Sequence, residues 1–111
     1  MQSIYRLKKN SSYEYVYRKG TSYPCRHMIL ICCPAKGSLK CGFSVTKKIG
    51  KAVVRNRVRR LLKENFRLLI PRVEEGYNYI FVARASILEA DFRTIGDSMR
   101  YLLKKSGHYK K

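Results

Sequence analysis

Apolar and polar residues follow two different periods along the chain, and these periods predict three helices and three strands. Helices are expected over 11–19, 51–70 and 92–105, the last two from apolar stripes at helical spacing. Strands are expected where short apolar runs lie between turn residues, over 26–34, 39–46 and 77–83. The pattern therefore indicates one domain over residues 1–111, in the order helix, two strands, long helix, strand, helix.

Capping residues mark the expected ends of the first and last helices. Ser11 and Glu14 fit a capping box at the start of the first helix, and Gly20 is expected to end it. Asp91 is expected to cap the last helix, and Gly107 to end it. The apolar positions of the last helix form one stripe: Phe92, Ile95, Met99, Leu102 and Leu103.

Turn residues between the first two strands predict how these strands pair. A proline and a glycine lie within 34–38, so the strands over 26–34 and 39–46 are expected to form an antiparallel hairpin. The strand over 77–83 is nearly all apolar or aromatic. This composition favours a place inside the sheet rather than at its edge.

The charge of the chain indicates a polyanionic partner. The 111 residues include 25 Lys and Arg against 7 Asp and Glu, a formal net charge of +18. A charge of this size repels itself and favours binding to nucleic acid or another polyanion. From Tyr15 to Lys63 the sequence has no acidic residue and thirteen Lys or Arg. The first half is therefore expected to present a basic face that binds phosphates.

Several function classes are excluded by what the sequence lacks. Its longest apolar run, 28–35, has eight residues, whereas a membrane-spanning helix needs about twenty. Residues 1–10 have no apolar core typical of a secretory signal. The cysteines lack the spacing of a zinc site and are expected to be small buried hydrophobes: Cys25, Cys32, Cys33 and Cys41. We therefore expect a cytoplasmic protein without membrane contact and without a metal of its own.

The long helix is expected to separate apolar from cationic residues. At about 100° per residue, one broad face is apolar: Val54, Val58, Leu61, Leu62, Phe66 and Leu69. The opposite face is polar and cationic: Asn56, Arg59, Arg60, Lys63 and Arg67, with Arg55 and Arg57 at the boundary. Arginine can bind a phosphate through two hydrogen bonds. Lys47 and Lys48 precede the helix and Lys51 begins it, and these lysines predict an anion site at its N-terminus.

The first helix leaves two interpretations open. Tyr13 and Tyr17 lie four residues apart and share a face. Tyrosines at a surface can stack on unpaired bases, which is how proteins commonly hold single strands. On their own, however, the two rings fit a packing stripe better than a stacking site.

Other classes of function compete with a dedicated RNA partner. A nuclease acting by itself would need paired carboxylates or a histidine acid–base site. No acid lies between Tyr15 and Lys63, and His27 and His108 are far apart in sequence. A general RNA-binding protein or RNA chaperone without a dedicated ribozyme partner is the alternative that charge alone leaves open.

The segment 43–66 adds a specific motif. It contains Arg-Asn-Arg at 55–57, preceded by Ser-x-x-Lys-Lys-x-Gly-x-Ala-Val at 44–53. With these residues the chain resembles the bacterial ribonuclease P protein subunit. The likeness extends over 5–111 and includes Tyr13-x-x-Val-Tyr17 on the first helix.

The resemblance implies a fold and a function. The implied fold is an α/β (α+β) two-layer sandwich, with a mixed sheet of about four strands and a left-handed crossover. The implied function is that of a ribonuclease P subunit, which helps a catalytic RNA remove the 5′ leader from precursor tRNA. In this family the RNA performs the chemistry with Mg²⁺, so no catalytic residue, no protein-bound cofactor and no obligate protein partner are expected.

The resemblance also implies two sets of site residues. Contacts to the ribozyme RNA are expected from Lys47, Lys48, Lys51, Arg55, Asn56, Arg57, Arg59, Arg60 and Lys63. Contacts to the precursor-tRNA leader are expected from Tyr13, Tyr17, Ile29 and Ile31. Members of the family often have an aromatic residue where this chain has Ile31, and an isoleucine cannot stack as a ring.

Overall fold

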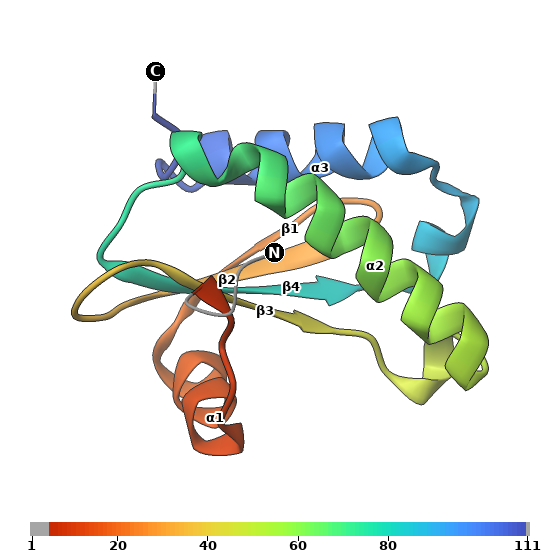
Figure 1. Cartoon of the computed structure of the whole chain (residues 1–111), viewed down its shortest axis with the longest axis horizontal. Coiled ribbons are helices and arrows are strands. Elements are labelled where there is room, and N and C mark those ends of the chain that lie inside the picture. Colours follow the sequence, from red (N-terminus) through yellow and green to blue (C-terminus); the bar gives the residue numbers. More distant parts are fainter. Residues whose placement is uncertain (1–4, 111) are drawn as a thin grey trace.

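The computed structural model describes residues 5–110 as a four-stranded sheet with helices on both faces (Figure 1). The three α-helices are α1 (Asn10–Lys19), α2 (Ala52–Leu69) and α3 (Phe92–Lys105). The strands are β1 (Thr21–Pro24), β2 (Met28–Pro34), β3 (Lys40–Ser44) and β4 (Tyr77–Ala83). Short 3-10 turns lie between them: η2 (Lys47–Ile49), η3 (Ile70–Arg72) and η4 (Ala85–Glu89). Helices α2 and α3 cover one face of the sheet, and α1 lies against the other.

The strand order is β1-β2-β4-β3, so β4 separates the two strands that the sequence predicts as a hairpin. β2 pairs antiparallel with β1 and β4, whereas β3 pairs parallel with β4 through the crossover helix α2. The hairpin prediction is therefore wrong. Its physical reason lies in β4, whose side chains need burial on both faces and gain it only at the centre of the sheet. The left-handed sense of the crossover stays a prediction.

Two further local features differ from the sequence analysis. Strand β1 was not expected, because Thr21–Pro24 lacks an apolar alternation and ends in a proline, which edge strands tolerate. The capping-box prediction for Ser11 and Glu14 is wrong, because α1 begins one residue earlier. Lys9 occupies the N-cap position, and no side chain caps the helix.

Aromatic residues hold α2 against the sheet. Phe66 is fully buried, and its ring centroid lies 6.1 Å from that of Phe43 and 5.7 Å from that of Phe81. Both contacts are edge-on, the geometry that aromatic quadrupoles favour. Because this apolar face of α2 is packed in the core, the opposite face of the helix is left to solvent.

α3 ends as the sequence predicts. Asp91 caps it by accepting a hydrogen bond from the Thr94 amide at 2.8 Å. At the other end Gly107 adopts φ +83°, and the His108 amide donates to the Leu103 carbonyl at 2.8 Å. These bonds are those of a helix end closed by a left-handed glycine. Phe92 is the exception to the buried stripe, since it is 38% exposed.

A buried amide joins the two helices of this layer. Asn65 on α2 donates through Nδ2 to the Leu61 carbonyl at 2.9 Å and to the Phe92 carbonyl at 3.1 Å. A Cβ at Gly96 would lie 2.5 Å from Asn65 Oδ1, so α3 can approach only because residue 96 is glycine. Asn65 was not predicted, because an asparagine on an apolar helix face gives no sequence signal for such a bond.

Candidate nucleic-acid interface

The exposed face of α2 carries the cations that the sequence analysis placed there. Arg57 and Arg60 are exposed, and Arg59 and Lys63 are partly buried. The lysines before the helix, Lys47, Lys48 and Lys51, are all exposed. Of the cations on the helix face only Arg67 has an acidic partner in the described part of the chain, Glu64 at 3.1 Å. This surface is therefore free to bind phosphates.

Two residues of the Arg-Asn-Arg motif have different environments within the protein. Asn56 accepts a hydrogen bond through Oδ1 from Nη2 of Arg59, one turn further along the helix. Arg55 is half-buried, and its Nε atom has no hydrogen-bond partner among residues 5–110. Asn56 thus restricts the position of the Arg59 guanidinium, a role that the sequence analysis did not foresee.

On the opposite face of the sheet, α1 packs over one end and leaves the rest open. Val16 is fully buried against Ile31, Cys33 and Ile80, while Ile29 and Val82 are only partly covered. Because side chains alternate along a strand, these residues of β2 and β4 form one apolar row. We call this surface, with Tyr13 and Tyr17 of α1 as its wall, the α1 groove.

The four predicted leader residues lie together in the α1 groove, but they differ in exposure. The Tyr13 and Tyr17 ring centroids are 6.5 Å apart, and Tyr17 is 45% exposed. Tyr13 is half-buried, and burial raises the pKa of its phenol, so the hydroxyl keeps its proton at neutral pH. Ile31 is only 8% exposed because α1 covers it. The accessible surface therefore comes from both tyrosines and from Ile29.

Tyr13 is placed by the strand beneath it. A Cβ at Gly42 of β3 would overlap the Tyr13 hydroxyl and ring, so the ring can lie there only because residue 42 is glycine. Sequence reasoning missed Gly42, because a glycine inside a strand indicates a close approach without saying which group approaches.

Replacing Gly42 by alanine is expected to displace the Tyr13 ring and to weaken binding of a single-stranded RNA about 5- to 20-fold, the scale of one lost base–aromatic stack. Fluorescence anisotropy with a labelled leader oligonucleotide measures this. Gly37→Ala is the control for backbone strain without displacement of Tyr13, since Gly37 has φ +88° and nothing lies within 4 Å of its Cβ. Equal binding by Gly42→Ala and the unchanged chain would mean that Tyr13 does not contact the leader.

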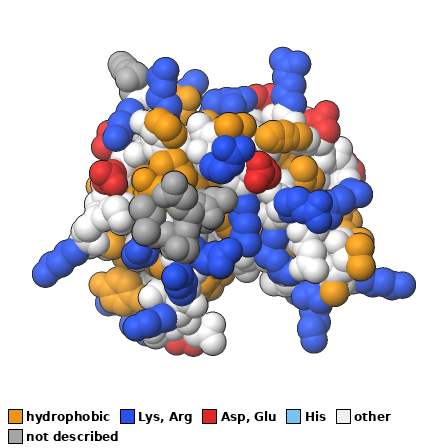
Figure 2. Space-filling view, viewed as in Figure 1, with side chains coloured by type: hydrophobic (Ala, Val, Ile, Leu, Met, Phe, Trp, Pro, Cys, Tyr) orange, Lys and Arg blue, Asp and Glu red, His pale blue; other side chains and the backbone are white. Residues whose placement is uncertain are grey.

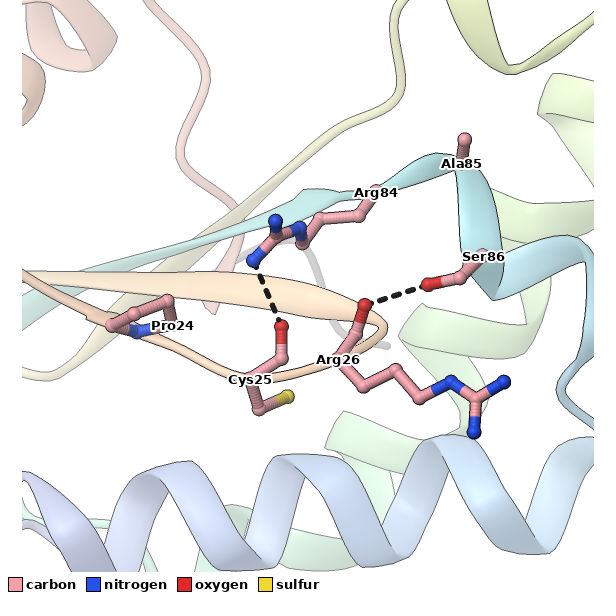
Figure 3. A pocket seen from close by; sticks show the side chains of 6 residues that line it. All are labelled: Pro24, Cys25, Arg26, Arg84, Ala85 and Ser86. Atoms are coloured by element: carbon pink, nitrogen blue, oxygen red, sulfur yellow. Dashed lines mark hydrogen bonds between the residues drawn. The ribbon is translucent and has the colours of Figure 1, made fainter.

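Another hollow lies at the β1–β2 turn and the end of β4. It has a volume of about 730 Å³ and is lined by Pro24, Cys25, Arg26, Arg84, Ala85 and Ser86 (Figure 3). Arg84 donates to the Cys25 carbonyl at 3.1 Å, and Ser86 Oγ donates to the Arg26 carbonyl at 2.6 Å. These hydrogen bonds join the end of β4 to the turn before β2.

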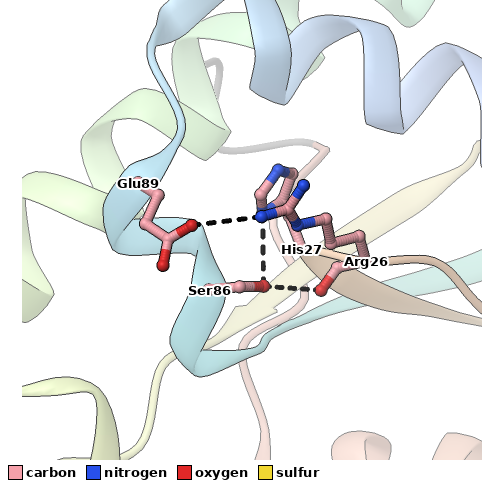
Figure 4. Close-up of polar contacts among 4 residues, drawn as sticks. All are labelled: Arg26, His27, Ser86 and Glu89. Carbon is pink, nitrogen blue, oxygen red and sulfur yellow. Dashed lines mark hydrogen bonds and ion pairs between the residues drawn. The ribbon is translucent and has the colours of Figure 1, made fainter.

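The side chains around this hollow are also paired with each other. Arg26 forms an ion pair with Glu89 at 3.2 Å, and Nδ1 of the buried His27 lies 3.2 Å from Ser86 Oγ (Figure 4). The cation of Arg26 is therefore partly neutralised, unlike the cations of α2 other than Arg67. The hollow is better explained as a structural junction than as a site.

The sequence predicts four small buried cysteines, and Cys25 differs from this prediction because it is only partly buried. All four cysteines are free thiols, and Cys32, Cys33 and Cys41 are buried. Burial raises the pKa of the Cys32 thiol to about 12, so this group stays protonated. Among the residues that the structure describes, no group of three His, Cys, Asp or Glu could hold a metal ion. Within the same residues no helix is long and apolar enough to cross a membrane.

Comparisons with known proteins agree on one family. Residues 1–107 match the model of the family Ribonuclease P. The ribonuclease P protein component of Caldanaerobacter subterraneus subsp. tengcongensis is 44% identical over 109 residues, which cover 97% of this chain and 94% of that protein. The same component of Thermoanaerobacter sp. is 45% identical over 109 residues with the same coverage.

Solved structures show the same fold. The RNase P protein of Staphylococcus aureus superposes with a TM-score of 0.87 at 30% identity, covering 96% of this chain and 98% of that one. The RNase P protein from Thermotoga maritima has a TM-score of 0.83 at 24% identity, over 90% of this chain and 96% of that one. The fold of this chain is therefore a recurring architecture.

This sheet and its cationic helix define the class of small basic α+β proteins whose exposed helix face suits a polyanionic partner. Within that class, the chain belongs to the bacterial ribonuclease P protein family. It is accordingly a subunit of an endoribonuclease that forms the mature 5′ end of tRNA. The prediction from the motif at 43–66 is confirmed.

Proposed function

We propose that the protein binds the ribozyme RNA with the exposed face of α2 and the 5′ leader with the α1 groove. The observation that carries this proposal is the placement of a cationic helix face, almost without acidic partners in the described residues, close to a partly apolar groove with two tyrosines. Folded RNA offers closely spaced phosphates to the first surface, and a single strand offers base faces to the second.

The ribozyme-binding residues of this proposal are Lys47, Lys48, Lys51, Arg55, Asn56, Arg57, Arg59, Arg60 and Lys63. The leader-binding residues are Tyr13, Tyr17, Ile29 and Ile31. Within these sets the roles differ: Arg57 and Arg60 are exposed for direct phosphate contact, whereas Asn56 positions Arg59. Ile31 supports the groove from beneath α1 rather than stacking on a base.

Chemistry in the complex is assigned to the RNA. Mg²⁺ would supply an activated hydroxide and stabilise the leaving oxygen of the scissile phosphodiester. The described protein residues do not fit a Mg²⁺ site, since they contain no group of three carboxylate, histidine or cysteine ligands. The protein's contribution is therefore to hold the two RNA partners in register, in the cytoplasm where both are found.

Adding the protein is expected to restore cleavage of a precursor tRNA by a bacterial ribonuclease P RNA at low Mg²⁺. Its cations reduce phosphate repulsion between the two RNAs, which Mg²⁺ otherwise screens. The measurement is the rate of product formation at the mature 5′ end, with and without the protein. Binding to the ribozyme RNA that leaves the cleavage rate unchanged would favour a general RNA chaperone instead.

A further inference from the structure

A small pocket lies between α1 and α2, along the outer side of β3. Its volume is about 120 Å³, and its walls include Arg6, Tyr13, Gly42, Arg59 and Lys63. These residues come from the segment before α1, from α1, from β3 and from α2, so the pocket connects the two surfaces of the proposed function. In Figure 2, Lys and Arg side chains gather across the middle of this view, between the regions of α1 and α2.

The backbone fixes Arg6 in this wall. The residue forms an isolated parallel bridge with Cys41, and the Leu7 amide donates to the Cys41 carbonyl at 3.0 Å. Leu7 is buried in the cluster under α1. Arg6 is thus brought to α2 although more than fifty residues separate them in sequence, which is why no sequence pattern indicated it.

Three cations converge on the pocket without an acid to balance them. Burial, together with the charges of Arg6 and Arg59, lowers the pKa of Lys63. The three ion pairs found among residues 5–110 involve none of these cations. The hydrogen-bond partner of Arg59 is the neutral side chain of Asn56. Like charges held together in this way cost free energy in the empty protein, and an anion would recover it.

The polar groups match one anion in particular. Two guanidinium groups and an ammonium group suit the oxygens of a phosphate, which accept several charged hydrogen bonds at once. The protonated hydroxyl of Tyr13 adds a neutral donor at the α1 side. A carboxylate has fewer oxygens and would accept hydrogen bonds from fewer of these donors. The small volume of the pocket leaves no room for a nucleobase beside the phosphate.

We propose that this pocket binds one phosphate group of an RNA backbone, through Arg6, Arg59, Lys63 and the Tyr13 hydroxyl. Its position between the α1 groove and the α2 face assigns it to the leader phosphate that lies nearest to the ribozyme-binding face. That assignment rests on the proposed function, whereas the phosphate site itself does not.

Inorganic phosphate tests the site on the protein alone. In a titration followed by amide NMR, saturable shifts are expected at residues 6, 42, 59 and 63. Arg6→Gln and Lys63→Gln are each expected to weaken this binding about tenfold, the effect of one lost charged hydrogen bond. Arg93→Gln, an exposed arginine on α3, is the control of equal charge and leaves binding unchanged. Shifts spread over all basic residues without saturation would overturn the site.

A second arm distinguishes an RNA phosphate from a free one. Single methylphosphonate linkages, which are uncharged, are placed in turn along the leader of a precursor tRNA bound to the complete ribonucleoprotein. One position is expected to lose about tenfold in affinity, and this loss disappears in Lys63→Gln because the same contact is already absent. Phosphate binding without such a coupled position would mean that the pocket takes free phosphate only.

The two tests can fail separately from the proposed function. Phosphate binding by a protein that does not restore precursor-tRNA cleavage would retain the pocket and reject the function. Restored cleavage together with unchanged phosphate binding in Arg6→Gln and Lys63→Gln would retain the function and reject the pocket.

Discussion

Replacing Arg57 and Arg60 together by alanine is expected to weaken binding of the ribozyme RNA by about 2–4 kcal/mol, the scale of two lost charged hydrogen bonds. This corresponds to a loss of about 30- to 1000-fold in affinity. Both side chains are exposed on α2 and form no ion pair with an acidic residue within residues 5–110. Filter binding at constant salt gives the affinity directly.

The same double variant is expected to unfold at nearly the same temperature as the unchanged chain. Exposed substitutions that break no contact usually change the free energy of unfolding by less than about 0.5 kcal/mol. Alanine is also a good helix former, so α2 is not weakened. A large drop in the melting temperature would instead mean that these arginines are structural.

A matched control distinguishes the effect of where the arginines lie on RNA affinity from the effect of the net charge. Replacing Arg72 and Arg93 by alanine removes two exposed arginines outside α2 and lowers the net charge by the same amount. If this control lost as much affinity as the α2 variant, RNA binding would depend only on the net charge of +18. A loss confined to Arg57 and Arg60 supports a defined binding face.

The sequence predicted those elements whose pattern is local. α2 and α3 fall within one residue of their predicted ranges, and β4 was predicted with both of its ends. In the two helices apolar residues recur at helical spacing, with Pro71 after α2 and Asp91 before α3, and β4 is a short apolar run that follows Gly76. Asp91, for example, caps α3 through a bond to an amide only three residues away.

Strand pairing was not local, and it was predicted wrongly. β2 and β3 are neighbours in sequence, but β4 inserts between them after the whole of α2. The turn residues at 34–38 are compatible with a hairpin. They are equally compatible with the observed connection, which leads from β2 past the position of β4 to β3. The pairing depends on which strand occupies the central position of the sheet, where both of its faces are buried. This choice involves β2, β3 and β4 together.

The candidate site likewise contains residues that the sequence predicts and residues that only the fold reveals. The cations of α2 follow from helical period alone, and all of the exposed ones lie where the period places them. Arg6 and Gly42 required the fold, because their importance comes from β3, which places one beside α2 and the other under Tyr13. Pairwise contacts of this kind leave no periodic trace in a single sequence.

The affinity of the protein for the ribozyme RNA is expected to depend steeply on salt. All eight cations of the proposed ribozyme-binding set lie at least partly at the surface: Lys47, Lys48, Lys51, Arg55, Arg57, Arg59, Arg60 and Lys63. If about five to seven phosphates are neutralised, the logarithm of the binding constant falls with the logarithm of salt concentration with a slope of about −4 to −6. Raising the salt from about 50 to 200 mM would then weaken binding about 250- to 4000-fold.

The slope also tests whether individual residues contact phosphates. Each lost phosphate contact flattens it by nearly one unit, so the variant lacking Arg57 and Arg60 is expected to have a slope smaller by about 1.5 to 2. The variant lacking Arg72 and Arg93 keeps the full slope, because those residues lie off the binding face. Equal slopes for both variants would contradict a phosphate-binding face on α2, and a nearly flat titration of the unchanged chain would contradict phosphate binding altogether.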